Sequence, residues 1–272
     1  MKNKENLSEE TKSSKPSAQG PLKLAVLVVI LAALGVGAYL GMRRPNAGLD
    51  KTPLPQLSTT VAPSEAEIEL TTTAGTIDIK LFPKLAPKAV ENFLTLAKEG
   101  YYKDNQFFRV LNNFMIQTGS KDNSSAGNSK SIWGSGYANE ISKSLWNIRG
   151  AVSLANSGQA NTNGSQFFIV QNPKDASSAI TDKTVVPQKI LDAYKKGGVP
   201  TLDGSYTVFG QVISGMSVVD KIANGAITSA TDSTGQSAGA PKNPFKITSV
   251  KIVKGWNFKS NAQTSGDVVN SK

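Results

Sequence analysis

The 272-residue chain contains no cysteine and no histidine. Without cysteine, disulfide bonds, thiol nucleophiles and thiolate metal sites are excluded. Without histidine, Ser-His and Cys-His catalysis and the commonest zinc ligand are excluded as well. The chain also lacks a Gly-rich phosphate loop of the G-x-x-x-x-G-K-[ST] type and a Ser-x-x-Lys motif. If the chain is an enzyme, we therefore expect it to work by positioning and electrostatics, with no cofactor and no metal.

Charge is plentiful but thinly spread. The 30 Lys and Arg residues exceed the 20 Asp and Glu residues, which gives a formal net charge of +10, yet no dense basic cluster occurs. We therefore expect no nucleic-acid partner. A solvated basic surface, near an anionic envelope, is the favoured interpretation.

The N-terminal region reads as a tail followed by a membrane anchor. Residues 1–23 are polar and of mixed charge, which is typical of a disordered tail, here assigned to the cytoplasm. Residues 24–42 carry no charge and are rich in Leu, Val, Ala and Ile. At about 1.5 Å per residue they nearly span a hydrocarbon core of roughly 30 Å, which predicts a transmembrane signal-anchor. A buried core helix and a cleaved signal peptide are the alternatives.

The charges flanking this run are balanced, so they do not fix its orientation. Because long domains translocate largely regardless of charge, we expect a single-pass protein of the cell membrane with its domain on the extracytoplasmic side. Residues 43–65 are rich in Pro, Thr and Ser and predict an extended linker that holds the domain away from the membrane.

A globular domain is expected over 66–254, followed by a flexible tail over 255–272. Alternation on both sides of Ala74-Gly75 predicts a hairpin over 66–81. Apolar spacing predicts a helix that begins at Pro87 and ends just before Gly100, helices over 186–196 and 216–222, and a closing strand over 245–253. Residues 119–139, rich in Gly, Ser and Asn, predict a long surface loop.

One stretch, 107–117, combines apolar strands with a single cation. The turn 111–113 separates two apolar runs, and Arg109 lies within the first of them. A half-buried guanidinium is costly unless it is paired or used, although an edge-strand Arg that reaches water is an open alternative. Strand alternation places Met115 and Gln117 on one face and Phe114 and Ile116 on the other.

A second stretch, 150–170, reads as strand, loop and strand. Its loop is full of Asn, Gly and Ser, residues that tolerate unusual backbone conformations and expose amide groups. Such a loop can present hydrogen bonds to an extended peptide.

Three motifs in this order resemble the cyclophilin family of peptidyl-prolyl cis-trans isomerases. They are Phe-Phe-Arg-Val-x-x-x-Phe-Met-x-Gln (107–117), Leu-Ala-Asn-Ser-Gly-x-x-x-Thr-Asn-Gly-Ser-Gln-Phe-Phe-Ile (154–169) and Leu-Asp-Gly-x-Tyr-Thr-Val-Phe-Gly-Gln-Val (202–212). The resemblance implies a mainly β fold: a closed eight-stranded antiparallel barrel capped by two helices, here preceded by one transmembrane helix. A barrel also removes exposed sheet edges.

The resemblance also implies roles for individual residues. Arg109 corresponds to the catalytic guanidinium, and Tyr206 takes the place of a pocket-wall His. The implied proline pocket is lined by Phe114, Met115, Phe168 and Leu202. The implied contacts to the substrate backbone come from Gln117, Ala155, Asn156 and Gln166.

The sequence departs from the family pattern at two positions and by one insertion. Thr201 stands where an aromatic residue often closes the groove, and Tyr206 keeps an aromatic face and a hydroxyl in place of His. These departures put strong cyclosporin binding in doubt. The helical insertion over 170–201 resembles that of bacterial membrane-anchored, surface-type members, and it either shapes the groove or is a tolerated surface feature.

The function expected from these observations is peptidyl-prolyl cis-trans isomerisation of folding, exported proteins by a monomeric enzyme. Its partners would be proline-containing polypeptides and the membrane. The competing hypothesis is a non-catalytic proline-peptide-binding or chaperone module tethered to the membrane, and a third, which rests on the anchor and linker alone, is a membrane-tethered adhesin.

Overall fold

The computed structural model describes residues 49–125, 130–228, 239–258 and 268–270. The predicted tail, the signal-anchor and the first residues of the linker lie outside these ranges. Within the described ranges, no helix has both the length and the apolar character that a membrane crossing requires.

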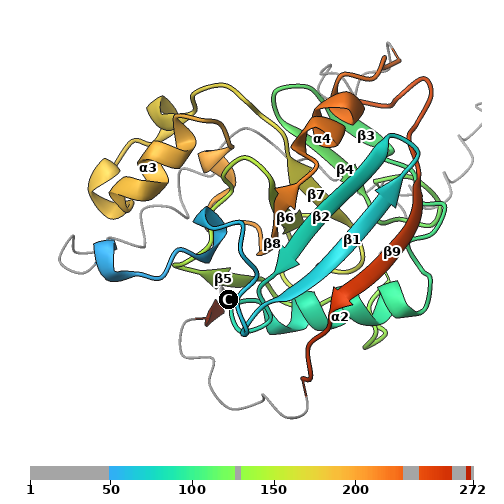
Figure 1. The fold of residues 1–272 in the computed structure, drawn as a ribbon, viewed down its shortest axis with the longest axis horizontal. Coiled ribbons are helices and arrows are strands. Elements are labelled where there is room, and N and C mark those ends of the chain that lie inside the picture. Colours follow the sequence, from blue (N-terminus) through green and yellow to red (C-terminus); the bar gives the residue numbers. More distant parts are fainter. Residues whose placement is uncertain (1–48, 126–129, 229–238, 259–267, 271–272) are drawn as a thin grey trace, which may run out of the picture.

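The domain is built on one sheet of eight antiparallel strands, in the order β3-β4-β7-β6-β8-β2-β1-β9 (Figure 1). The predicted hairpin over 66–81 is confirmed, with Ile68 paired to Ile79. The strands are β1 Ala66–Thr72, β2 Gly75–Leu81, β3 Arg109–Leu111, β4 Met115–Thr118, β6 Ala151–Leu154, β7 Phe167–Val170, β8 Val208–Ser214 and β9 Ile247–Lys254.

The prediction of a closed barrel is wrong in detail, because the sheet is open between β3 and β9. These two edge strands form no ladder with each other. The chain just before β3 instead meets the start of β9: Gln106 forms an isolated bridge with Lys246, and the Phe107 N–H donates to the Phe245 carbonyl at 2.9 Å. Within β3 itself, the Val110 N–H donates to the Gly239 carbonyl at 2.7 Å, so this edge meets residue 239 and not β9.

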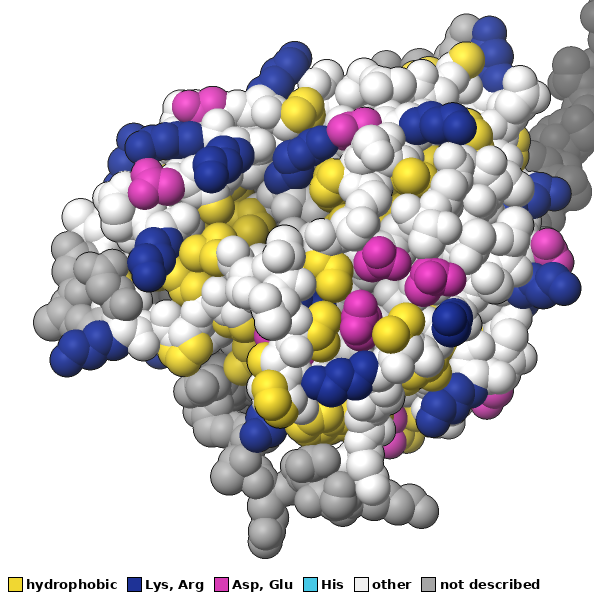
Figure 2. All heavy atoms as spheres, in the orientation of Figure 1, with side chains coloured by type: hydrophobic (Ala, Val, Ile, Leu, Met, Phe, Trp, Pro, Cys, Tyr) yellow, Lys and Arg dark blue, Asp and Glu magenta, His cyan; other side chains and the backbone are white. Residues whose placement is uncertain are grey.

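The inner face of the curved sheet holds the main apolar core. Alternate residues point inward, so Ile68, Ile116, Val152 and Phe209 share one buried cluster with residues of two helices. Helices α2 (Pro87–Lys98) and α4 (Met216–Ala223) lie near opposite ends of the sheet, as Figure 1 shows. Figure 2 shows Lys and Arg side chains scattered over this face of the molecule.

Helix α2 receives its N-terminal cap from a distant strand. It begins at Pro87, which fits the first helical turn, but Ala86 has no side-chain oxygen to cap it. The carboxylate of Glu140, in β5 (Glu140–Ser142), instead accepts the N–H groups of Lys88 and Ala89, both at 3.0 Å. Burial raises the pKa of the Glu140 carboxyl, and the two hydrogen bonds oppose that shift.

Residues 49–65 differ from the expected extended linker, because they pack on the sheet. They include one-turn 3₁₀ helices at Leu49–Lys51 and Pro55–Leu57. The buried Gln56 side chain donates to the Trp146 carbonyl and to Gln211, each at 2.9 Å. The buried Lys80 ammonium donates to the Pro55 carbonyl at 2.6 Å. Composition alone could not show this docking, since its partners are distant in the sequence.

The insertion has a core of its own. Its predicted helix is present as α3 (Gln188–Tyr194), beside the sheet in Figure 1. Ile190 and Tyr194 of this helix are fully buried against Trp146 and Ile148. Of the expected flexible tail, the structure describes residues 255–258 and 268–270, and the latter form β10 (Val268–Asn270), which pairs with β5.

Candidate active site

Arg109, Gln117 and Phe168 lie side by side on three neighbouring strands. The register pairs Arg109 of β3 with Gln117 of β4, and Gln117 with Phe168 of β7. Paired residues of antiparallel strands point to the same face, here the outer one. Arg109 is half-buried, whereas Gln117 and Phe168 are fully buried. The structure therefore brings a cation, an amide and an aromatic ring onto one surface.

A second apolar cluster, which we call the outer cluster, surrounds this row on the outside of the sheet. Met115 and Phe168 from the strands pack there with Ala155 and Leu202 from loops. Phe114 and Tyr206 are half-buried against it. Six of the ten predicted site residues thus belong to one packed surface.

The placement of Phe114 opposite Met115 is wrong. Phe114 packs with Met115 in the outer cluster, whereas Ile116 lies in the inner core. Strand β4 begins only at Met115, so Phe114 belongs to the preceding turn and strand alternation does not apply to it. Asn113 in that turn has φ +60°, a left-handed conformation that Asn tolerates better than most residues.

Two buried glutamines form a polar pair next to the cation. Gln117 Nε2 donates to Gln166 Oε1 at 3.0 Å, and the side chains are at most 3% exposed. The side-chain oxygen of Gln117 has no further hydrogen-bond partner among the described residues. A buried amide with an unused acceptor is suited to receive an N–H group from an extended peptide.

Tyr206 completes the site from the loop side. Its ring meets Phe168 edge-on, with centroids 5.6 Å apart. Burial raises the pKa of the Tyr206 hydroxyl, and the positive charge of Arg109 acts in the opposite direction. The hydroxyl therefore lies within the field of the guanidinium and stays neutral around pH 7.

Ala155 and Asn156 lie just after β6. The Ala155 N–H donates to the Gln166 carbonyl at 2.9 Å, which extends the β6–β7 pairing. The Asn156 side chain donates to Asn139 at 3.2 Å and accepts from the Gly158 N–H at 3.0 Å. Because its amide is used in shaping the loop, any contact of Asn156 with a peptide would come from its backbone.

The comparisons with known proteins agree with this geometry. Residues 67–252 match the family model described as cyclophilin type peptidyl-prolyl cis-trans isomerase. The chain belongs to the cyclophilin family. It is therefore a cyclophilin-type peptidyl-prolyl cis-trans isomerase, and its sheet and helices are those of a cyclophilin domain.

Relatives with this description occur among bacteria. A protein of Staphylococcus aureus (strain COL), named as a candidate peptidyl-prolyl cis-trans isomerase, is 48% identical over 174 residues, which cover 62% of this chain and 87% of the relative. A Staphylococcus epidermidis protein (strain RP62A) with the same name is 46% identical over 177 residues, which cover 64% and 88%.

Solved structures show the same domain. A cyclophilin-type isomerase of Cryptosporidium parvum has 27% identity and a TM-score of 0.54, covering 71% of this chain and 99% of its own. The same protein in the presence of the dipeptide Ala-Pro has 28% identity and a TM-score of 0.53, with 70% and 99% coverage.

The sequence did not reveal how the loop side of the cyclophilin site is held. Asp203, next to Leu202, accepts the Tyr194 hydroxyl at 2.6 Å and the Asn147 backbone N–H at 2.8 Å. Thr201 is exposed, so no aromatic side chain covers the site from that position. The only sequence signal for Asp203 was its place in the Leu-Asp-Gly motif. The described residues contain no cluster of three or more His, Cys, Asp or Glu side chains that could hold a metal ion.

Proposed function

We propose that this isomerase accelerates X-Pro rotation by electrostatic stabilisation of the twisted amide, with Arg109 as the catalytic cation. The peptide bond has a rotation barrier of about 18–20 kcal/mol because resonance keeps it planar. Rotation breaks that resonance and makes the prolyl nitrogen a better hydrogen-bond acceptor. A fixed guanidinium near this nitrogen stabilises the twisted state more than the planar one.

The observation that carries this proposal is the row formed by Arg109, Gln117 and Phe168. Arg stays charged at all relevant pH values and has a rigid planar fork, which suits a fixed electrostatic role. In the proposed complex, Phe114, Met115, Phe168 and Leu202 hold the pyrrolidine ring by apolar contact. Gln117 and Gln166, with the backbone of Ala155 and Asn156, hold the flanking peptide. The Ala-Pro dipeptide named with the Cryptosporidium structure belongs to the same ligand class.

The test is a protease-coupled isomerisation assay on a short X-Pro peptide. Arg109→Ala is expected to lower kcat/KM by at least about 100-fold, because the cation acts mainly in the transition state. The thermal unfolding midpoint should change little, since Arg109 is only half-buried. Near-full activity in the variant would remove Arg109 from the mechanism. An inactive wild-type protein would instead favour the non-catalytic peptide-binding module.

We further propose that the domain is tethered to the cell membrane through residues 24–42 and faces the extracytoplasmic side, where it acts on exported chains. The support is the uncharged 19-residue run in the sequence. Slow proline steps limit the folding of many chains, so a tethered isomerase would act where they emerge. Protease treatment of intact cells should remove the domain; full protection, with digestion only after lysis, would contradict this orientation.

A further inference from the structure

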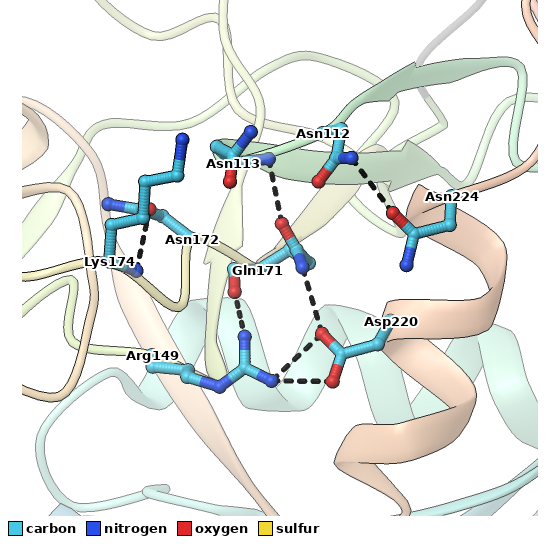
Figure 3. A network of polar contacts seen from close by, with 8 residues as sticks. All are labelled: Asn112, Asn113, Arg149, Gln171, Asn172, Lys174, Asp220 and Asn224. Atoms are coloured by element: carbon cyan, nitrogen blue, oxygen red, sulfur yellow. Dashed lines mark hydrogen bonds and ion pairs between the residues drawn. The ribbon is translucent and has the colours of Figure 1, made fainter.

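We infer that Gln171 is a positioning residue for Phe114, held in place by Asp220 and Arg149 from outside the candidate site. This inference rests on the proposed function, because it concerns how the proline pocket is kept in shape. Figure 3 shows the turn between β3 and β4 and the side chains around it: Gln171 follows β7, Asp220 lies in helix α4, and Arg149 lies just before β6.

Gln171 is hydrogen-bonded to the backbone of the turn that carries Phe114. The Gln171 N–H donates to the Phe114 carbonyl at 2.8 Å, and the Asn172 N–H reaches the same carbonyl at 3.3 Å. The side-chain oxygen of Gln171 accepts the Asn113 N–H at 2.9 Å. Gln171 is only 2% exposed, so these bonds are shielded from water. Two successive residues of the turn are therefore fixed by one side chain and its neighbouring backbone.

Asp220 and Arg149 fix the other end of Gln171. The Gln171 amide nitrogen donates to Asp220 Oδ1 at 2.8 Å. The Arg149 guanidinium donates to both oxygens of Asp220, at 2.8 and 2.7 Å, and also to the Gln171 carbonyl. The Gln171 amide is thus held at its oxygen and its nitrogen, which leaves it one orientation.

The turn needs such support because of its conformation. Asn113 is left-handed at φ +60°, and both Asn112 and Asn113 are exposed, so apolar burial does not hold this part of the turn. Phe114 is itself only half-buried. The hydrogen bonds from Gln171 therefore keep the turn, and with it Phe114, in the position from which the ring can contact the pyrrolidine ring of the substrate.

The same turn and helix provide a matched control. Asn112 Nδ2 donates to Asn224 Oδ1 at 2.8 Å, which is a second link between the turn and the α4 end of the molecule. This bond joins two exposed side chains and fixes no backbone atom of the turn. If the network acts by positioning Phe114, its loss should matter far less than the loss of Gln171.

The experiment measures kcat and KM separately for the full-length protein and its variants. Gln171→Ala is expected to raise KM about tenfold with kcat changed less than about twofold, because Phe114 contributes to binding of substrate and transition state alike. Asp220→Ala should raise KM in the same direction. Asp220→Asn keeps an acceptor for the Gln171 amide and should recover most of the loss. Asn224→Ala should leave KM within about twofold of the wild type.

The decisive measurement is a double-mutant cycle with Phe114→Ala. If Gln171 acts through Phe114, Gln171→Ala should add almost nothing to the loss of kcat/KM already caused by Phe114→Ala. The inference would be overturned if Gln171→Ala lowered kcat/KM by the same factor in the wild type and in Phe114→Ala. It would also be overturned if Gln171→Ala folded and had the KM of the wild type. Should Gln171→Ala not fold, equal KM values for Asp220→Ala and Asp220→Asn would overturn it instead. Loss of activity in Arg109→Ala tests the proposed function separately.

Discussion

On one side of the candidate site, Arg109, Gln117 and Phe168 project from paired strands, whereas on the other side Leu202 and Tyr206 project from a loop. The strand residues are fixed by backbone register. Leu202 lies in the single 3₁₀ turn Pro200–Leu202 and has no strand partner. Its position depends on side-chain hydrogen bonds to the neighbouring Asp203.

The difference shows two ways of fixing a side chain. On the sheet side, a ladder of backbone hydrogen bonds fixes the positions of the residues, regardless of the identity of most side chains. The loop side depends on particular polar groups, and removing one of them leaves a buried partner unsatisfied. Substitutions on the sheet side should therefore act directly on the isomerisation step. Substitutions of the residues that support the loop side should act on substrate binding and on the stability of the fold.

After Arg109→Ala, the largest effect predicted on the sheet side concerns the glutamine pair. Gln117→Leu and Gln166→Leu should each lower kcat/KM about tenfold, because each removes a buried amide that holds the peptide. The two amides bond to each other at 3.0 Å, so they act as a unit. The double variant should therefore lose little more than the worse single variant, as measured by the same peptide assay. Losses that multiply to about 100-fold would mean that the two residues act independently.

A smaller effect is expected behind the loop side. Tyr194→Phe removes the hydroxyl that donates to Asp203 at 2.6 Å while keeping the buried ring. Loss of a hydrogen bond to a charged group should lower the free energy of unfolding by about 1.5–3 kcal/mol. We expect KM to rise about threefold because Leu202 is held less firmly, with kcat unchanged. Urea unfolding and steady-state kinetics measure the two effects.

The control for Tyr194 lies on the same helix. Asp192 and Lys195 form an ion pair at 2.9 Å between two exposed side chains. Lys195→Ala should change neither the unfolding midpoint nor KM measurably, since exposed pairs contribute little. If Tyr194→Phe behaves like Lys195→Ala, the insertion does not support the site.

The same contrast explains what the sequence could and could not predict. Strand alternation located Met115 and Gln117 correctly, because a period of two follows from the backbone alone. The rule failed at Phe114, where the chain leaves the strand. The hydrogen bonds of Gln171 to Asp220 and of Asn147 to Asp203 were not predictable, since each joins residues that lie far apart in the chain.

Large-scale features follow the same division. The hairpin and the helices carry local signals such as Pro87 at a helix start and a turn at Ala74-Gly75. The opening between β3 and β9 has no local sequence signal, because it depends on how the two edge strands meet in space. Likewise, a Pro-rich segment resembles a spacer in composition, yet Gln56 anchors it through buried contacts to Trp146 and Gln211.

The smallest effect is expected from pH, and it again separates the two sides. Among the ten candidate residues, Arg109 and Tyr206 carry ionisable groups. The guanidinium stays charged, and burial raises the pKa of Tyr206 above its ordinary value of 10.0, so the hydroxyl stays protonated between pH 6 and 9. The kcat/KM should change less than about twofold over this range, as measured by a direct, protease-free assay.

The substitution Tyr206→His, on the loop side, should make kcat/KM depend on pH. The imidazole would lie near Arg109, whose charge disfavours a second cation, so its pKa should fall below its usual value of about 6.5. Below that pH the protonated ring would repel the guanidinium and disturb the pocket wall, so activity should fall on the acid side only. An inflection between pH 6 and 9 in the wild type would mean that a group outside the ten candidates titrates with catalysis. A flat profile in Tyr206→His, measured well below pH 6 as well, would instead mean that a charge at position 206 does not affect catalysis.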